Sequence, residues 1–296
     1  MPLQALPSEL ESSVYLGSVR GGEPAAREAH DIWFLETSGR RKLTARQACS
    51  IESASRHNGD FTVHLLHTGR HLRSCAYRRI LSKLPNFSSA RLRPRTELAG
   101  TPLSRLYSDR RALRESSSLV EHLSDFLRYA IIWKRGGVYL DLNIIVLKSL
   151  KPIENSVAFE EDEVHVTNSV LFFRKMHPAV RALMKACARQ YDPRSFQSCG
   201  PLLLTQLRHA PFYARLVNFL SSSTFFKVSF GEWKMFFDPT MTEKVLEEVN
   251  GSYGAHLWNR FSKGTKAIIG SGSPLEHLAR IHCPSVYRQA STAGYL

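Results

Sequence analysis

The sequence lacks the features that mark zinc-binding, repeat or membrane-spanning proteins. Residues 1–30 contain neither a signal-peptide core nor a run of about 18 apolar residues that could cross a bilayer. No internal repeat or low-complexity block suggests a solenoid or a long disordered tail. With 296 residues, 43% hydrophobic and 22% charged, the chain has the composition of an ordinary globular protein of one large or two modest domains.

Acidic residues are scarce, because 26 Asp and Glu face 40 Lys and Arg, for a net charge of +14. Such a charge attracts nucleic acid, an anionic membrane surface or a diphosphate. The basic residues stand in short separate groups without a nucleic-acid motif, so a solvated surface is the favoured interpretation for most of them. Nucleic-acid binding is a third-ranked hypothesis, which predicts salt-sensitive retention on DNA or RNA.

Cysteine is also infrequent, and no C-x-x-C pair or zinc spacing occurs. An oxidising compartment would permit one or two bridges and leave at least one thiol unpaired, without the sequence assigning the pairs. The five positions are Cys49, Cys75, Cys187, Cys199 and Cys283. N-x-S/T sequons at Asn86 and Asn250 are usable only if the chain enters the secretory pathway.

The most informative stretch runs from Ser118 to Leu150. Apolar residues recur at helical spacing in its first half, which predicts an amphipathic helix. Ser118 and Glu121 have the spacing of a capping box, and Gly136 and Gly137 supply a sharp stop. The helix is therefore expected to break directly into a strand.

That strand is predicted to run from Val138 to Leu147. Side chains alternate along a strand, so Tyr139, Asp141 and Asn143 would share one face. A carboxylate in so apolar a strand is costly unless a metal ion or a hydrogen-bond donor pairs with it.

Asp125 and Arg128 lie three residues apart on the predicted helix and hence on one face. With Tyr139, Asp141 and Asn143 they make a compact polar set of carboxylates, guanidinium, phenol and amide. A buried ion pair beside a strand end explains the spacing equally well.

These residues also carry a resemblance to a known family, the DXD-containing α1,4-galactosyltransferases and α1,4-N-acetylglucosaminyltransferases. The matching positions are Ser124, Asp125, Arg128, Gly136, Gly137, Tyr139 and Asp141. The sequence departs at Asn143, where the family usually has the second aspartate. Other similar strings follow in the same order, from about Ile32 to Cys283.

The resemblance implies a role for each residue of the set. Asp141 would face the ribose and the metal, Asn143 would take the main metal-ligand position, and Asp125 with Arg128 would hydrogen-bond the donor sugar. Mn²⁺ or Mg²⁺ would act as a Lewis acid on the leaving diphosphate of UDP-galactose or UDP-N-acetylglucosamine. Tyr139 would belong to the donor site.

Asparagine can coordinate through its carbonyl oxygen but brings no charge. Asn143 therefore raises a second hypothesis, that the chain is a catalytically silent sugar-nucleotide-binding or glycan-binding protein. Asn143→Asp distinguishes the two hypotheses, because it should raise metal-dependent turnover in a weakened enzyme.

The start of the chain predicts a β-α-β unit, with strands at 31–38 and 61–67 and a helix at 43–58. Ligands of such sheets lie beyond the carboxyl ends of the strands, which predicts Glu36, Thr37 and Ser38 near a nucleotide. The family has strings similar to F-L-E-T-S and C-S-x-E-S-A, the second matched within residues 49–54. For any one of these residues, a strand end or helix packing is an equally good interpretation.

The remaining elements are less distinctive. A strand and a helix are expected within 70–117, a strand at 164–173, and helices at 178–191 and 202–207. Asn168 resembles a position that lines the family's sugar pocket. The acidic run 160–163 is predicted to be a mobile, solvated loop, with metal binding as a minority alternative.

Near the C-terminus the sequence is similar to the family's Y-x-x-H-x-W-N string at Tyr253, His256, Trp258 and Asn259. The resemblance implies that His256 completes the metal and diphosphate site, and neutral imidazole is a competent ligand for such a metal. Lys263 would screen diphosphate charge.

The resemblance implies a GT-A type α/β fold, a single domain of two halves. Residues 31–155 would bind the nucleotide sugar, 156–296 would face the acceptor, and 1–30 would be an N-terminal extension. The implied activity is retaining α1,4 transfer of galactose or N-acetylglucosamine to a glycolipid or glycan, as in glycosphingolipid synthesis. Family members are typically Golgi membrane proteins, so we expect a lumenal fragment without its anchor, which meets the membrane through its acceptor.

Overall fold

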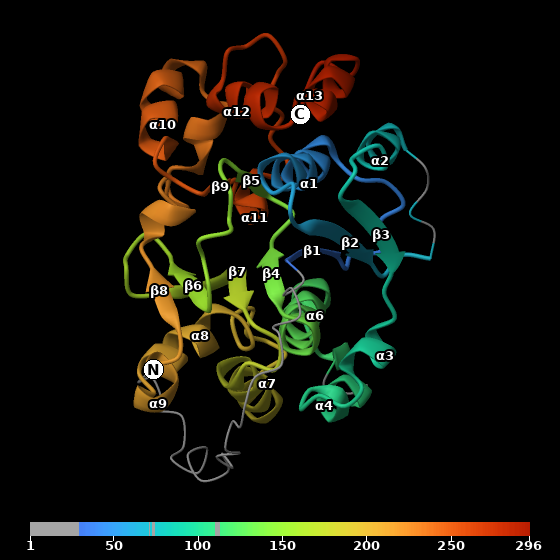
Figure 1. The fold of residues 1–296 in the computed structure, drawn as a ribbon, viewed down its shortest axis with the longest axis vertical. Helices are drawn as coiled ribbons and strands as arrows, with labels where there is room; N and C mark the ends of the chain where they lie inside the picture. The colour runs from blue at the N-terminus through green and yellow to red at the C-terminus, as the bar shows by residue number, and fades with distance from the viewer. Residues whose placement is uncertain (1–29, 71, 73–74, 110–112) are drawn as a thin grey trace.

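A computed structural model describes residues 30–70, 72, 75–109 and 113–296 of the chain (Figure 1). The predicted N-terminal extension therefore lies almost entirely outside the described residues. The strands are β1 Asp31–Glu36, β2 Thr62–His67, β3 Phe87–Arg91, β4 Gly137–Leu140, β5 Ile144–Val146, β6 Ser156–Phe159, β7 Val166–Phe173, β8 Asn218–Leu220 and β9 Gly254–His256.

Helices surround these strands. The α-helices are α1 Ala45–His57, α2 Ala76–Leu81, α3 Pro94–Leu98, α4 Ser104–Ser108, α6 Leu119–Arg135, α7 Pro178–Gln190, α8 Pro201–Arg208, α9 Pro211–Ala214, α10 Thr242–Val249, α11 Asn259–Ser262, α12 Pro274–His282 and α13 Pro284–Ser291. Short 3₁₀ turns are η2 Ser222–Thr224, η3 Trp233–Phe237 and η4 Pro239–Met241. Within the described ranges, no helix is both long and apolar enough to cross a membrane.

The main sheet has seven strands in the order β3-β2-β1-β4-β7-β6-β8. Strands β3, β2, β1 and β4 are parallel, so their carboxyl ends meet at one edge, whereas β7 runs antiparallel to β4. The predicted β-α-β unit is confirmed, because β1 and β2 are parallel neighbours joined by α1. A second sheet pairs β5 with β9, and its register sets Ile144 opposite His256.

Apolar residues on both faces of the sheet build two cores. Along β1, Ile32 and Phe34 join the core that includes α1, α12 and α13, while Trp33 and Leu35 join the core that includes α6, α7 and α8. This arrangement follows from the alternation of side chains in a strand, and a sheet covered on both faces has apolar residues at successive positions. Figure 1 shows α1, α12 and α13 on one side of the sheet and α6 and α7 on the other.

The predicted strand 138–147 is wrong as a single element. Strand β4 ends at Leu140, a turn follows in which Ile144 N donates to Asp141 O at 3.2 Å, and β5 then pairs with β9 instead of β7. Asp141 and Asn143 therefore lie in a turn between two sheets rather than on one strand face. A change of hydrogen-bonding partner leaves no trace in an alternating sequence pattern.

The boundaries of α6 are close to the prediction, but its capping box is not formed. Ser118 is the N-cap residue, yet its side chain makes no capping bond. At the other end, Gly136 and Gly137 have φ of 73° and 97°, as the sharp stop requires. A Cβ on Gly136 would lie 2.6 Å from Lys175 N, so this turn also needs the missing side chain.

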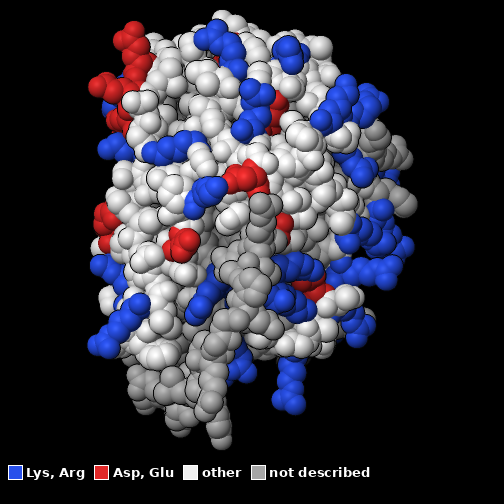
Figure 2. All heavy atoms as spheres, viewed as in Figure 1, with Lys and Arg blue, Asp and Glu red and all other residues white. Residues whose placement is uncertain are grey.

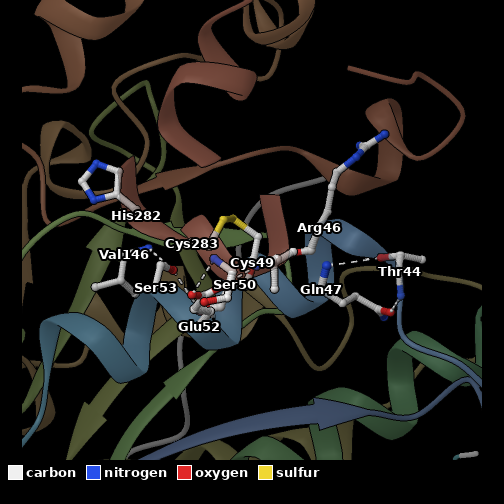
Figure 3. The surroundings of a disulfide bond; sticks show 12 residues. Thr44, Arg46, Gln47, Cys49, Ser50, Glu52, Ser53, Val146, His282 and Cys283 are labelled. Carbon is white, nitrogen blue, oxygen red and sulfur yellow. Dashed lines mark hydrogen bonds between the residues drawn. A yellow bond between two sulfur atoms is a disulfide. The ribbon is translucent and has the colours of Figure 1, made fainter. Parts of the chain in front are cut away.

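Cysteine usage follows the prediction, and the structure assigns the pairs. Cys49 bonds to Cys283 and Cys187 to Cys199, which leaves Cys75 as a free thiol. Figure 3 shows that the first bridge joins α1 to the segment between α12 and α13. Two segments 234 residues apart in sequence are thereby held together.

The two sequons differ in their surroundings. The Asn86 amide donates to the carbonyls of Ser55, Asn58 and Phe61 at 2.9–3.2 Å, so it joins the end of α1 to the segment before β3. Asn250 is exposed at the end of α10. Of the two sequon asparagines, Asn250 is exposed, whereas the Asn86 side chain is partly buried and hydrogen-bonded to the backbone.

The acidic run 160–163 forms the turn between β6 and β7, where its carboxylates accept bonds from neighbouring backbone. Asp162 accepts from Val164 N, Glu163 from Ser222 N, and Glu161 from Phe230 N at 2.7–3.1 Å. Among the described residues, no group of three or more His, Cys, Asp or Glu side chains could hold a metal ion. The minority metal interpretation of this run therefore finds no support, and its predicted mobility stays a prediction.

Basic side chains are spread over the face drawn in Figure 2, in agreement with their separate groups along the sequence. The excess of Lys and Arg over Asp and Glu is plain there, and both kinds of charge stand at the surface. On this face the basic side chains are solvated, as the favoured interpretation of the net charge expects.

Candidate active site

A buried ion pair on α6 forms the base of the site. Arg128 Nη2 lies 3.3 Å from Asp125 Oδ1, and each residue is only 6% exposed. Asn168 on β7 donates from Nδ2 to the same carboxylate oxygen at 2.8 Å. The predicted spacing of Asp125 and Arg128 on one face of α6 therefore places the pair against β7, which carries Asn168.

The Arg128 guanidinium links this pair to the turn after β4. Its Nη1 lies 3.2 Å from Asp141 Oδ1 and donates to Asn168 O at 2.7 Å. Its Cζ atom lies over the Tyr139 ring, 4.6 Å from the ring centroid, and the Tyr139 hydroxyl donates to Asp141 Oδ1 at 2.5 Å. One arginine therefore contacts two carboxylates, a phenol and a backbone carbonyl. The guanidinium, the two carboxylates and the phenol are four members of the predicted polar set, whereas its amide, Asn143, contacts His256 instead.

Burial and charge determine the protonation of this set. Burial raises the pKa of Asp125 to about 6, against the opposing effects of Arg128 and Asn168. Burial by itself would lower the pKa of Arg128, but Asp141, Tyr139 and Asp125 outweigh it and raise that pKa. Burial also raises the pKa of Tyr139, so at neutral pH its hydroxyl keeps the proton that it donates to Asp141.

His256 and Asn143 meet where β5 pairs with β9. His256 Nε2 lies 3.2 Å from Asn143 Nδ2, and the Nδ1 atom is buried without a hydrogen-bond partner in the described part of the chain. Burial lowers the pKa of His256 to about 4, although Asp141 opposes the shift. The imidazole is neutral at pH 7, and a neutral ring has a nitrogen lone pair for a metal.

Asp141, Asn143 and His256 fit a divalent cation that keeps other ligands. Asp141 Oδ2 makes no hydrogen bond to any described residue, Asn143 supplies an amide oxygen, and His256 supplies a ring nitrogen. The set contains a single carboxylate, which Arg128 partly neutralises. Mn²⁺ or Mg²⁺ would therefore need the oxygens of a bound diphosphate or water to complete its coordination.

Strand β1 ends at Glu36, and Thr37 follows it, at the same edge of the sheet. Trp33 on β1 pairs with Tyr139 on the parallel strand β4. Glu36 lies three positions after Trp33, and Asp141 lies two positions after Tyr139, so both follow the paired residues toward the carboxyl ends of the strands. Glu36 is 3% exposed, and its Oε1 accepts from Ser38 N at 3.2 Å while its Oε2 is buried without a described partner. Thr37 Oγ1 donates to Val120 O at 3.2 Å.

Lys263, like Glu36 and Thr37, has no described hydrogen bond or ion pair to the other predicted site residues. It is exposed at the C-terminal end of α11 and forms no hydrogen bond or ion pair through its side chain within the described residues. Its role toward a diphosphate stays a prediction.

Two contacts of the site were not foreseen from the sequence. Ser124 Oγ accepts from Arg128 Nη2 at 2.8 Å, and the i, i+4 spacing was the available signal. Gly200 lies so close that a Cβ there would be 3.2 Å from Asn168 Nδ2 and from Asp125 Oδ2. The sequence indicated Gly200 only as a helix start or pocket residue, because the approach depends on a loop from another part of the chain.

The C-S-x-E-S-A string packs the fold together rather than lining the site. Glu52 is fully buried and accepts from Ser285 N at 3.0 Å and Val286 N at 2.8 Å, at the start of α13. Ser53 Oγ accepts from Val146 N on β5 at 3.0 Å (Figure 3). Of the two interpretations, helix packing is the one that these contacts support.

Comparison with known proteins places the chain in a family. Residues 44–161 match the glycosyltransferase sugar-binding region containing a DXD motif, and residues 172–290 match the α1,4-glycosyltransferase conserved region. Lactosylceramide 4-alpha-galactosyltransferase of Mus musculus is 30% identical over 282 residues, which cover 90% of this chain and 77% of that protein. Alpha-1,4-N-acetylglucosaminyltransferase of Homo sapiens is 29% identical over 294 residues, which cover 92% of this chain and 84% of that protein.

The fold agrees with this relationship. The PaToxG glycosyltransferase superposes with a TM-score of 0.50 at 14% identity, over 87% of this chain and 84% of that one. The mixed α/β sheet is of the GT-A type, as expected from the resemblance. The chain therefore belongs to the α1,4-glycosyltransferase family and is a hexosyltransferase by its relationships.

Proposed function

We propose that the protein transfers galactose, or N-acetylglucosamine, from a UDP-sugar to a hydroxyl of a galactose-terminated glycolipid or glycan, in α1,4 linkage and with retention. The observation that carries this proposal is the linkage of Asp125, Arg128 and Asn168 to Asp141, next to the pair Asn143 and His256. Carboxylates and an amide suited to sugar hydroxyls thereby lie beside residues suited to a metal and a diphosphate.

The chain's own residues supply binding and positioning. Asp125, fixed by Arg128 and Asn168, offers its carboxylate to hydroxyls of the donor sugar. Arg128 orients Asp141 through an ion pair, and the Tyr139 hydroxyl donates to the same carboxylate oxygen. Glu36 has a buried acceptor atom free for a nucleoside hydroxyl or N–H at the end of β1.

A divalent cation held by Asp141, Asn143 and His256 would neutralise the charge of the departing diphosphate. Retention of the anomeric configuration can arise by two routes, a covalent enzyme intermediate or front-face attack guided by the leaving phosphate. We nominate no nucleophile, and assign the rate enhancement to positioning and to stabilisation of the leaving UDP.

Two disulfides within the described residues suit an oxidising compartment, which supports the proposed Golgi lumenal location. The acceptor would then be a membrane glycolipid or a lumenal glycan. Of the two proposed halves, 31–155 would supply most of the donor site and 156–296 would face the acceptor, while Asn168 and His256 of the second half reach into the donor site.

A second candidate function rests on Asn143. With an amide in place of the second carboxylate, the site has less negative charge for a cation, so the chain could bind a sugar nucleotide or glycan without turnover. Nucleic-acid binding keeps third rank, because only the net charge favours it.

The test is UDP release by the purified chain with UDP-galactose and with UDP-N-acetylglucosamine, in Mn²⁺ or in chelator, with lactose-terminated and other acceptors. Acceptor-dependent and chelator-sensitive release is the expected result, and it names the donor. Absence of release while UDP still binds would reject the transferase and favour the binding protein.

A further inference from the structure

Two exposed phenylalanines lie in contact beside the candidate metal ligand. The Phe230 and Phe261 side chains are 45% and 48% exposed, and their rings stack with centroids 6.0 Å apart and planes 25° apart. Exposed apolar side chains scattered singly need no explanation, whereas contiguous exposed apolar groups are more often found at binding sites. We call these two rings the aromatic platform.

The aromatic platform is continuous with His256 through one buried tryptophan. Trp258 is 8% exposed, and its ring lies 4.4 Å from the His256 ring and 6.1 Å from that of Phe230. Its Nε1 donates to Val228 O at 2.8 Å, which joins the loop that carries Phe230 to the segment that carries His256. A platform ring is thus two ring contacts away from the candidate metal site.

The backbone on both sides of the aromatic platform is held in place. Trp258 has φ of 50°, an unusual conformation for a bulky residue, and it turns the chain directly from β9 into α11, where Phe261 is exposed. On the other side, Phe230 N donates to Glu161 Oε2 at 3.1 Å. The two rings are therefore positioned by contacts that do not depend on the rings themselves.

The segment that carries Phe261 also reaches the other side of the site. The Arg260 guanidinium lies 3.9 Å from the Phe196 ring centroid, in the loop that leads to Gly200. Gly200 in turn abuts Asp125 and Asn168, the proposed donor-sugar residues. Residues from Trp258 to Phe261 therefore connect the proposed metal side of the site with its proposed sugar side.

We propose that the Phe230–Phe261 platform is the acceptor subsite, on which the apolar C–H face of the acceptor's terminal pyranose stacks. This inference rests on the proposed transferase function. An acceptor must approach the donor sugar between the metal side and the sugar side, and the aromatic platform begins where these two sides are connected. Aromatic faces suit a pyranose because one face of the sugar presents C–H groups while the hydroxyls at its rim remain solvated.

The experiment compares four variants in steady-state kinetics with a lactose-terminated acceptor. Phe261→Ala and Phe230→Ala should each raise the acceptor KM about five- to tenfold, with a much smaller change in the donor KM. Phe261→Tyr keeps the ring and should restore the acceptor KM. Phe212→Ala is the matched control, because Phe212 on α9 is also an exposed phenylalanine (39%). An unchanged acceptor KM in both platform variants would overturn the proposal.

If the wild-type chain has no transferase activity, the proposed function is wrong, but binding of a sugar to the aromatic platform is still untested. Saturation-transfer NMR with lactose, UDP and Mn²⁺ then tests that binding directly. A lactose signal in wild type and Phe212→Ala that Phe261→Ala loses supports the subsite. The same signal in all three proteins, or none in wild type, overturns it.

A lipid surface is the competing occupant of two exposed rings. Co-sedimentation with phosphatidylcholine vesicles that lack glycolipid separates the two. Equal binding of wild type and Phe261→Ala to these vesicles is expected. If wild type sediments with these vesicles and Phe261→Ala does not, the Phe230 and Phe261 rings contact lipid, and the acceptor proposal is wrong.

Discussion

Asn143 Nδ2 lies 3.2 Å from His256 Nε2, across the antiparallel pairing of β5 with β9. The two residues are 113 positions apart in sequence, yet they form one edge of the candidate metal site. An amide at this position makes the site weaker for a cation than a second carboxylate would, because a hard cation favours charged oxygen ligands.

Asn143→Asp should strengthen metal binding. A carboxylate there adds a negative charge next to a neutral imidazole, and we expect the Mn²⁺ concentration for half-maximal UDP release to fall about tenfold. Isothermal titration of Mn²⁺ in the presence of UDP measures the same change without turnover. Asn250→Asp, at an exposed position, is the control. Equal Mn²⁺ affinity in wild type and Asn143→Asp would remove Asn143 from the ligand set.

Asp125→Asn should change how stability depends on pH. Burial raises the pKa of Asp125 to about 6, above its value in an unfolded chain, so the native state holds this proton more tightly. The stabilising contribution of the protonated form is complete below pH about 4 and is lost as the pH rises through 6. We expect the unfolding free energy of wild type, relative to Asp125→Asn, to fall by on the order of 2 kcal/mol between pH 4 and pH 7.

Urea unfolding of both proteins at several pH values checks this difference. The comparison cancels the carboxyl groups that the two proteins share. A difference that stays constant from pH 4 to 7 would contradict the raised pKa.

Arg128→Ala should be strongly destabilising. It leaves the buried Asp125 without its cation and removes an ion pair from Asp141, at a cost of about 3–5 kcal/mol. Urea denaturation measures the loss, and Arg181→Ala, an exposed arginine on α7, serves as the control. A loss no larger than that of the control would mean that the two carboxylates do not depend on this guanidinium.

Glu52→Gln should weaken the attachment of α13. The Glu52 carboxylate accepts two backbone N–H groups at the start of that helix, where negative charge is favoured. We expect a loss of about 1–2 kcal/mol in the free energy of unfolding, larger at low salt. Glu247→Gln, at an exposed position on α10, should stay near wild type. Amide hydrogen exchange at Val286 would locate the loosened turn, and unchanged protection there would argue against the capping role.

The sequence by itself determined most of the local structure. The pattern of β1, α1 and β2 predicted a parallel unit, and the spacing of Asp125 and Arg128 put both on one helical face, as the structure has them. These features depend on residues within a few turns of one another, where periodicity and glycine placement control the backbone. The resemblance in the motif strings, rather than any spacing, predicted which α/β fold and family this is.

Only the tertiary structure decided which residues meet across long sequence distances. The break between β4 and β5, the contact of Asn143 with His256, the approach of Gly200 to Asp125 and the pairing of Cys49 with Cys283 all depend on segments remote in sequence. A strand's alternation is the same whichever neighbour it pairs with, so the sequence could not separate one strand from two. Side-chain partners that arrive from another element are settled by packing of the whole chain, and local patterns carry no record of that packing.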